Sequence, residues 1–239
     1  MRVEKVIRMT QRITRVRFFS VFSSAAFTLL FSLSAWSSNL VIEITQGVDN
    51  PVPIAVVPFQ WSGDRALNED VAQVIDADLE RSGQFKSLKR SLMLSFPFQK
   101  EDVYFRDWQY LATEYLVIGQ VVTTDTGGFQ VDYQLFDVQR QESIVSGRFA
   151  GGKNDLRALG HSISDAVYEA LTGLKGAFRT RIAYVAADKK VNPSYYKLLV
   201  ADSDGYNAKE ILKSNQPIMS PSWSRDATKL AYVSFETNR

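Results

Sequence analysis

The sequence has 239 residues, of which 45% are hydrophobic and 23% are charged, so it can form one large domain or two small ones with a buried core. Its formal net charge is +2, but residues 1–37 hold six bases and one acid, and the remainder holds three more acids than bases, which excludes a strongly basic nucleic-acid surface. The lack of cysteine excludes disulfide bonds, thiolate metal sites, thiol catalysis and a lipidated N-terminal cysteine.

Residues 1–37 have the layout of a secretory signal peptide. A basic segment, Arg2 to Arg17, precedes an apolar segment, Phe18 to Leu33, and Ala35 and Ser37 are small residues at the positions that a signal peptidase reads. We expect cleavage near Ser37 or Ser38, which leaves no transmembrane segment in the mature chain. A retained membrane anchor is the alternative, because the apolar run approaches the length of a spanning helix. Its five serine or threonine residues weaken that alternative.

Residues 38–175 are predicted to form an α/β domain with a mixed sheet of about five strands, because strands and helices alternate early and a meander follows. Asn68 is expected to cap the first helix, and Gly83 is expected to end it. Asp107 is expected to cap a short second helix. A long third helix is expected over Asp155–Thr172, ended by Gly173, and Ser91–Asp102 is expected to be a surface loop. The expected strands are Leu40–Thr45, Ile54–Phe59, Phe85–Leu88, Tyr115–Val122, Phe129–Val138 and Ser143–Ala150.

Residues 176–239 show no helical spacing, and we place the domain boundary near Gly176. Predicted strands recur at intervals of roughly ten to fifteen residues, which is typical of an all-β architecture. Ser224–Ala227 is expected to be a tight turn between the last two strands. A two-stranded hairpin is marginal in water, so we expect this region to begin a larger β-structure and the sequence to be a truncated chain. The expected strands are Ile182–Ala186, Lys197–Ala201, Lys209–Lys213, Ser220–Ser224 and Lys229–Ser234.

Two stretches suggest chemistry but lack its full pattern. Gly160 to Ser164 approaches the Gly-x-Ser-x-Gly elbow of serine hydrolases, but it lies inside a predicted helix, and no histidine follows His161, the only one in the chain. We expect His161 to form a local hydrogen bond on a helix flank. Asp202 to Gly205 resembles the start of a calcium loop, but its glycine and third ligand are misplaced, so a hairpin turn is expected.

The aromatic residues Trp61, Tyr104, Trp108 and Tyr110 fit either a partner surface or a core. Trp223 and Tyr232 are instead expected to pack inside a propeller blade, because large aromatic side chains dominate such layers.

Four segments together resemble the TolB family of the Tol-Pal system of Gram-negative bacteria. They are LVIEITQGVDNPVPIAVVPF from Leu40, HSISDAVYEALTGLKGAFRTRIAYV from His161, DSDGYN from Asp202 and MSPSWSRDATKLAYVSFE from Met219. The resemblance covers essentially the whole mature chain, although it is patchy through Lys89 to Trp108. It implies an α/β domain followed by the start of a six-bladed β-propeller. One departure is Ala227, where the family's turn usually has glycine, so this hairpin is expected to be strained or of another turn type.

The resemblance implies a periplasmic protein-binding component with no catalytic residue, cofactor or metal, acting in outer-membrane integrity and in constriction at division. It implies the partners Pal and TolA, with the Pal-binding residues mainly in later blades. A short apolar strand can add to a partner's sheet, although the same stretch also fits an ordinary first strand. The stretch implied to contact TolA comprises Asn39, Leu40, Val41, Ile42, Glu43, Ile44, Thr45, Gln46, Gly47 and Val48.

Two alternatives remain open from the sequence. The chain could be the propeller portion of a prolyl-oligopeptidase-type serine peptidase, which would need a hydrolase domain beyond Arg239. It could also be an α/β module that functions without a propeller. Further blades in a longer chain favour the binding protein, whereas a true nucleophile elbow with a later Asp and His favours the peptidase.

Overall fold

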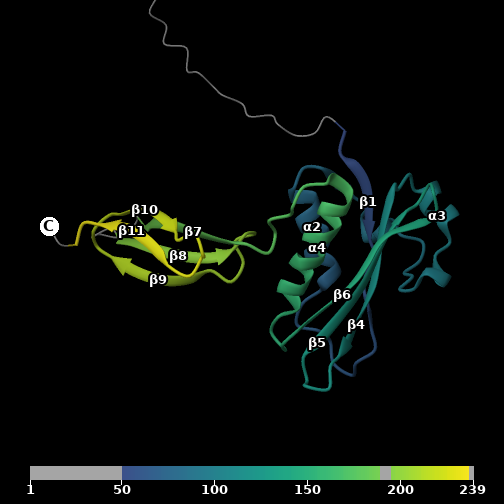
Figure 1. Cartoon of the computed structure of the whole chain (residues 1–239), viewed down its shortest axis with the longest axis horizontal. Coiled ribbons are helices and arrows are strands. Elements are labelled where there is room, and N and C mark those ends of the chain that lie inside the picture. Colours follow the sequence, from purple (N-terminus) through teal and green to yellow (C-terminus); the bar gives the residue numbers. More distant parts are fainter. Residues whose placement is uncertain (1–49, 189–194, 237–239) are drawn as a thin grey trace, which may run out of the picture. The chain divides into compact units, whose positions relative to one another are not determined.

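The computed structural model describes residues 50–188 and 195–236 (Figure 1). The first part is built on a six-stranded mixed sheet in the order β3-β1-β4-β5-β6, with the short strand β2 also paired to β4. Pairings among β1, β2, β3 and β4 are parallel, whereas β4, β5 and β6 form an antiparallel meander. The strands are β1 (Val52–Val56), β2 (Gln60–Trp61), β3 (Phe85–Ser87), β4 (Tyr115–Thr123), β5 (Phe129–Asp137) and β6 (Glu142–Gly151). The predicted mixed sheet is confirmed.

Two long helices cover one face of this sheet. Helices α2 (Val71–Arg81) and α4 (Leu156–Thr172) lie side by side in Figure 1 and bury apolar stripes against β1, β4 and β5. Gly160 permits their close approach, since a Cβ there would lie 3.1 Å from the Cβ of Val74. The main core of the domain therefore lies between this helix pair and the sheet.

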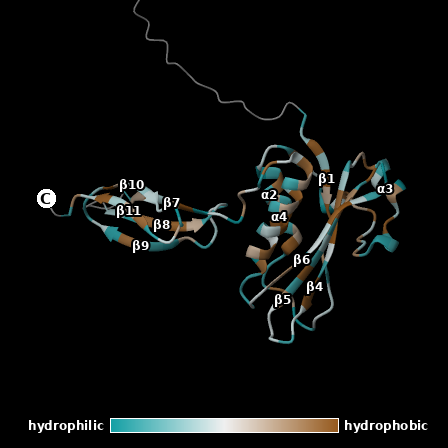
Figure 2. Ribbon diagram, viewed as in Figure 1, coloured by the Kyte–Doolittle hydropathy of each residue, from teal (hydrophilic) through white to brown (hydrophobic). Residues whose placement is uncertain are grey.

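The opposite face carries a second, smaller core. Trp108 of helix α3 (Phe105–Tyr110) is 1% exposed and packs with Leu116, Ile118 and Phe136 of β4 and β5. Because successive side chains of a strand point to opposite faces, Ile54 and Val56 belong to the first core and Ala55 to the second. Both faces of β1 are buried, which explains its continuously apolar sequence; Figure 2 shows the hydropathy along the ribbon.

Several predicted boundaries are corrected. The N-cap of α2 is Asp70, not Asn68, and its side chain accepts a hydrogen bond from the Gln73 N–H at 3.1 Å. Helix α3 begins before Asp107, which lies in its first turn and does not cap it. The predicted loop Ser91–Asp102 overlaps two short 3-10 helices, η1 (Arg90–Leu92) and η2 (Lys100–Asp102). The predicted strand Leu40–Thr45 lies outside the described residues.

The second part consists of antiparallel β-structure. Strands β7 (Arg181–Asp188), β8 (Tyr195–Asp202) and β9 (Lys209–Ser214) form a three-stranded sheet, and β10 (Ile218–Trp223) pairs with β11 (Leu230–Ser234). All five strands were predicted, with starts or ends that differ by up to two residues. Leu198 and Ile218 are buried, but Tyr232 is 42% exposed, so the prediction that Tyr232 packs inside a blade is wrong for this structure. Trp223 is partly buried beneath the guanidinium of Arg181.

Candidate functional site

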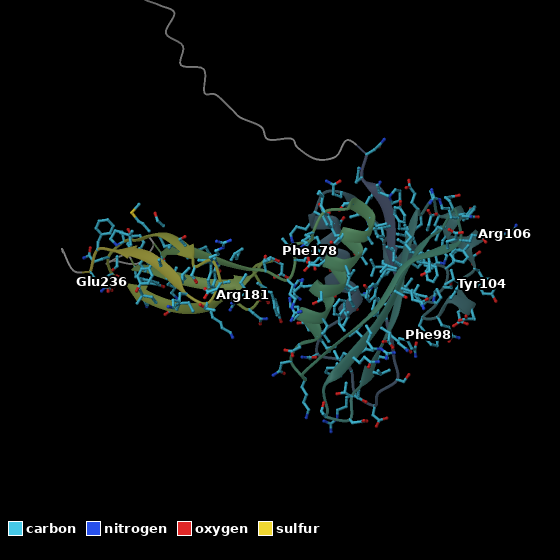
Figure 3. The ribbon with its side chains drawn as sticks, viewed as in Figure 1. Phe98, Tyr104, Arg106, Phe178, Arg181 and Glu236 are labelled. Atoms are coloured by element: carbon cyan, nitrogen blue, oxygen red, sulfur yellow. The ribbon has the colours of Figure 1, made fainter. Side chains whose placement is uncertain are left out.

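The segment expected to contact TolA, residues 39–48, lies outside the described residues. The aromatic residues for which the sequence left two alternatives are now placed. Trp108 belongs to the core, and Trp61 packs edge-on against Phe129. Tyr104 is 70% and Tyr110 85% exposed, and the sticks of Figure 3 show Tyr104 near Arg106 on the α3 side of the sheet.

The serine motif is part of helix α4 and has no exposed elbow. Ser162 donates its hydroxyl hydrogen to the Ala158 carbonyl at 2.9 Å, and Ser164 donates to the Gly160 carbonyl at 3.0 Å. Both side chains thus bond the preceding helical turn, as buried helical serines commonly do. The prediction that this motif lies inside a helix is confirmed.

His161 is the centre of a buried polar cluster. Its side chain is 3% exposed, and its Nδ1 donates to Oδ2 of Asp78 in α2 at 2.6 Å. The prediction of a local hydrogen bond on a helix flank is therefore wrong, because the partner lies in another helix. Asp78 is 1% exposed and also pairs with the Arg81 guanidinium one helical turn later. Asp78 therefore has two partners, His161 and Arg81, and these interactions offset the free-energy cost of removing its carboxylate from water.

Arg157, one helical turn before His161, extends the cluster. It pairs with Glu69 at 3.2 Å and with the carboxylate of Asp204, and its guanidinium stacks over the Tyr206 ring at 4.0 Å from the ring centroid. Asp204 and Tyr206 belong to the turn between β8 and β9. The cluster therefore joins α2, α4 and the β8–β9 turn through charged hydrogen bonds.

The β8–β9 turn has the predicted hairpin-type hydrogen bonds. The Gly205 N–H donates to the Asp202 carbonyl at 2.8 Å, and Gly205 has φ of +85°, which favours glycine. Burial alone would raise the pKa of Asp204, but the Tyr206 N–H and the Arg157 guanidinium outweigh it and hold the pKa below its usual value. Asp204 is therefore a carboxylate at neutral pH.

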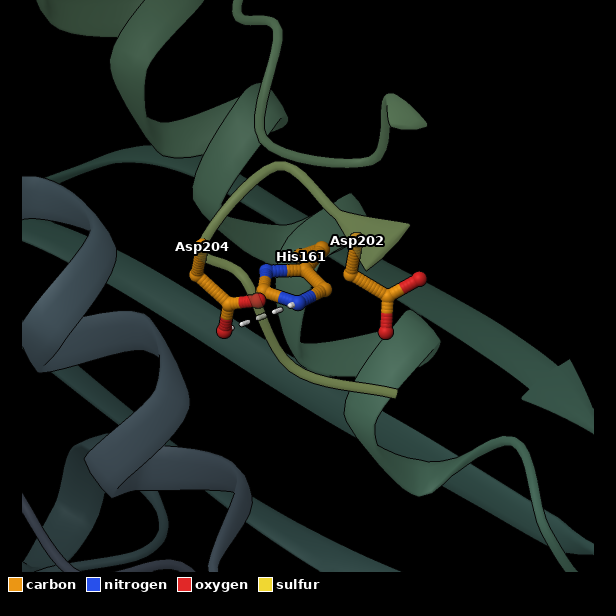
Figure 4. A group of neighbouring side chains, drawn as sticks. All are labelled: His161, Asp202 and Asp204. Carbon is orange, nitrogen blue, oxygen red and sulfur yellow. Dashed lines mark ion pairs between the residues drawn. The ribbon is translucent and has the colours of Figure 1, made fainter. Parts of the chain in front are cut away.

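Three side chains of this cluster carry potential metal-ligand atoms that lie close to one another. One ligand atom from each of His161, Asp202 and Asp204 lies within 4.8 Å of the others (Figure 4). Nε2 of His161 is buried without a hydrogen-bond partner and lies 3.8 Å from Oδ2 of Asp204. Chemically, this arrangement can hold either a cation between the three side chains or a proton on Nε2.

Sequence reasoning missed Asp78 and Arg157. Asp78 lies on the same helical face as Val71, Val74 and Ile75, and a carboxylate on an apolar helix face requires a buried partner. The only histidine of the chain lies on the buried face of the other long helix. These two positions were a signal for a helix-to-helix pair, but the sequence alone does not show which two helices pack together.

Comparisons with known proteins cover both parts of the chain. A family model described as the TolB amino-terminal domain matches residues 40–144, and one described as the TolB beta propeller domain matches residues 168–239. Tol-Pal system protein TolB from Hahella chejuensis is 45% identical over 215 residues, which is 89% of this chain and 50% of that protein. Tol-Pal system protein TolB from Alcanivorax borkumensis is 46% identical over 215 residues, which is 90% of this chain and 48% of that protein.

The structural comparison agrees. The crystal structure of TolB from Acinetobacter baumannii superposes with a TM-score of 0.68 at 38% identity, covering 82% of this chain and 47% of that one. The chain spans about half the length of the relatives that it matches. The described helices include none that is both long and apolar enough to cross a membrane.

Proposed function

This chain belongs to the TolB family of Tol-Pal system proteins, and from that premise we propose that it is a periplasmic protein-binding component of the Tol-Pal system. The family is non-enzymatic. The proposed role is to bind TolA and Pal and thereby support outer-membrane integrity and constriction at division. The observation that carries the proposal is the match of two TolB family models, in the family's order, to the two parts of the chain.

We propose that residues 39–48 contact TolA. Residues Ile42 to Thr45 alternate apolar and polar, with Ile42 and Ile44 on the same side if the segment is extended. An extended segment of this kind can add to the edge of a partner's sheet, where main-chain hydrogen bonds give affinity and alternate side chains give specificity. An ordinary strand of the chain's own sheet is the competing role for these residues, and it would not require a partner.

For Pal, we expect weak capture by this chain. Its relatives are about twice as long, and we expect most Pal contacts to lie in later propeller blades, as the resemblance implies. The separate expectations for the two partners make the proposal specific, because TolA binding should depend on residues 39–48 whereas Pal binding should be slight with or without them.

Capture of the secreted chain by immobilised TolA and by immobilised Pal tests this function. We expect TolA to retain the chain and the variant Ile42→Asp/Ile44→Asp to lose retention, because two charges would be buried in the added strand. The matched control Leu174→Asp places a charge at a side chain that is already 62% exposed and should bind as the unmodified chain does. Equal TolA capture of all three proteins would contradict the proposed contact, and tight capture by Pal would contradict the assignment of that surface to later blades.

A further inference from the structure

The buried cluster around His161 contains a polar atom whose bonding is incomplete. Asp78 is an acceptor when it is ionised, so Nδ1 of His161 must carry the hydrogen of their 2.6 Å bond. In a neutral imidazole the lone pair then lies on Nε2, which is buried and has no hydrogen-bond partner. Figure 4 shows a dashed line from this nitrogen to the carboxylate of Asp204, which lies in the β8–β9 turn, and Asp202, the last residue of β8, lies in the same group.

The hydrogen bond from Nδ1 to a carboxylate is the arrangement that supports metal-ligating histidines. Such a histidine usually donates its other ring N–H to a carboxylate or carbonyl, which sets the tautomer and makes the ligating nitrogen more basic. Asp78 occupies this supporting position, and its own second interaction with Arg81 holds it in place. Asp78 therefore orients the His161 ring without any contribution from Asp202 and Asp204, the two carboxylates that would complete the site.

The cluster has a surplus of negative charge that a divalent cation could neutralise. Its carboxylates outnumber its guanidiniums by two when His161 is neutral: the acids are Glu69, Asp78, Asp202 and Asp204, and the bases are Arg81 and Arg157. A buried surplus of charge is unfavourable unless an ion or a proton compensates it. A doubly charged ion compensates this surplus completely, whereas one proton on His161 compensates half of it.

We propose that His161, Asp202 and Asp204 bind a single divalent transition-metal ion, with Zn²⁺ as the best fit. One imidazole nitrogen and two carboxylate oxygens suit Zn²⁺, whereas Ca²⁺ and Mg²⁺ prefer oxygen ligands alone. Asp202 is partly exposed, so a water molecule can reach a fourth coordination position. The ligands are now at most 4.8 Å apart and have to move closer together when the ion binds.

The site would tie helix α4 to the β8–β9 turn. Arg157 already connects these elements through Asp204, and Asp202 accepts a hydrogen bond from the Asn207 amide at 2.9 Å within the turn. An ion would bind His161 of α4 to two carboxylates, that of Asp202 at the end of β8 and that of Asp204 in the turn. The sequence did not predict this site, because the turn alone lacks the spacing of a metal loop and the third ligand comes from α4.

Calorimetric titration of the metal-stripped full chain with ZnCl₂ tests the proposal. We expect one ion to bind per chain, and Asp202→Asn to weaken binding by more than about tenfold, as loss of a direct ligand should at least match loss of an outer-shell partner. Asp226→Asn is the matched control, because Asp226 lies in the exposed β10–β11 turn. A second ligand variant, His161→Asn, tests the imidazole, and circular dichroism shows whether each variant folds.

A second measurement keeps the outcome decisive if a variant is unstable. Co²⁺ added to the unmodified chain should give the visible absorption of a low-symmetry nitrogen and oxygen site, and Zn²⁺ should displace it while Ca²⁺ and Mg²⁺ should not. No Zn²⁺ binding, binding that Asp202→Asn leaves unchanged, or tighter binding of Ca²⁺ would each overturn the proposal.

Discussion

At the scale of single residues, Asp70 performs two tasks with one carboxylate. It caps α2 by accepting the Gln73 N–H, and it binds both terminal nitrogens of Arg90 at 2.6 and 2.9 Å. Burial alone would raise its pKa, but the Arg90 hydrogen bonds and the Gln73 N–H outweigh burial and hold the pKa below the usual 3.8. The carboxylate form is therefore favoured by folding.

This shift predicts a defined dependence of stability on pH. Because the folded pKa of Asp70 is below its unfolded value, its contribution is complete above about pH 4 and is lost as the pH falls through the folded pKa. Asp70→Asn keeps a good capping residue but removes the charge. Urea unfolding at several acidic pH values should show the unmodified chain converging on the variant as the pH falls. Arg90→Gln should reproduce most of the change, and parallel curves for all three proteins would contradict the prediction.

Ala227 is the residue at which this chain departs from the family's turn. Its φ is +54°, a region that costs an L-residue with a Cβ roughly 1 kcal/mol, and the turn is closed by its N–H donating to the Ser224 carbonyl. This positive φ agrees with the expectation from the sequence that the hairpin is strained or of another turn type. Ala227→Gly should stabilise the hairpin by about 0.5–1 kcal/mol, measured by thermal unfolding. Ala231→Gly in the neighbouring strand is the control, and it should destabilise; stabilisation by both changes would contradict the strain at residue 227.

At the scale of elements, the close pairing of β4 with β5 depends on Gly119. A Cβ at this position would lie 2.4 Å from the Asp132 carbonyl oxygen and 2.5 Å from the Phe59 ring, and the backbone cannot easily yield inside a sheet. Strand β4 was predicted almost to the residue, but nothing local in its sequence indicates that the glycine faces a neighbour's main chain.

Gly119→Ala should therefore destabilise the α/β domain by about 1–3 kcal/mol, the typical range for overpacking a well-packed site. Gly152→Ala is the matched control: the nearest atom to its added Cβ is the Asp155 carboxylate oxygen at 3.3 Å, and the residue is exposed. Chemical denaturation monitored by tryptophan fluorescence measures the free energy of unfolding of both variants. Trp108 reports on unfolding because it is buried in the second, smaller core of the domain. Equal stability of the two variants would show that the sheet adjusts at Gly119.

At the scale of the whole molecule, the two parts differ in how completely they are buried. Leu116, Val117 and Ile118 of β4 have no exposed surface, and their side chains belong to the two cores on opposite faces of the sheet. In β11, Tyr232 and Val233 are 42% and 49% exposed. Strands β10 and β11 form a sheet with no third strand among the described residues, and such a pair is only marginally stable by itself.

Hydrogen exchange should reveal this difference. Amides of β4 should exchange only through global unfolding, whereas those of β11 should exchange through local opening at least about a hundredfold faster. Mass spectrometry of peptides from residues 115–123 and 230–234 measures the two rates in one sample, which makes each segment the control for the other. Equal protection of both segments would mean that β11 is stabilised by contacts beyond those described.

Much of the fold follows from local sequence patterns. The apolar runs and alternating segments identified the sheet strands, the apolar stripes identified α2 and α4, and Gly173 ends α4 in the left-handed conformation that was expected of it. These features could be predicted because periodicity and turn chemistry act over a few residues. Helix starts were predicted less well: Asn68 and Asp70 are both good caps by residue type, and the structure shows that Asp70 caps α2.

The sequence by itself determined the order of the elements, the α/β and all-β parts, and the family to which the chain belongs. Only the tertiary structure decided that His161, Asp78, Arg157 and Asp204 meet, because these residues come from two helices and a distant turn. The physical reason is range: a secondary structure element is set by interactions between near neighbours in the chain, whereas a buried polar cluster exists only after packing removes water from residues far apart in sequence.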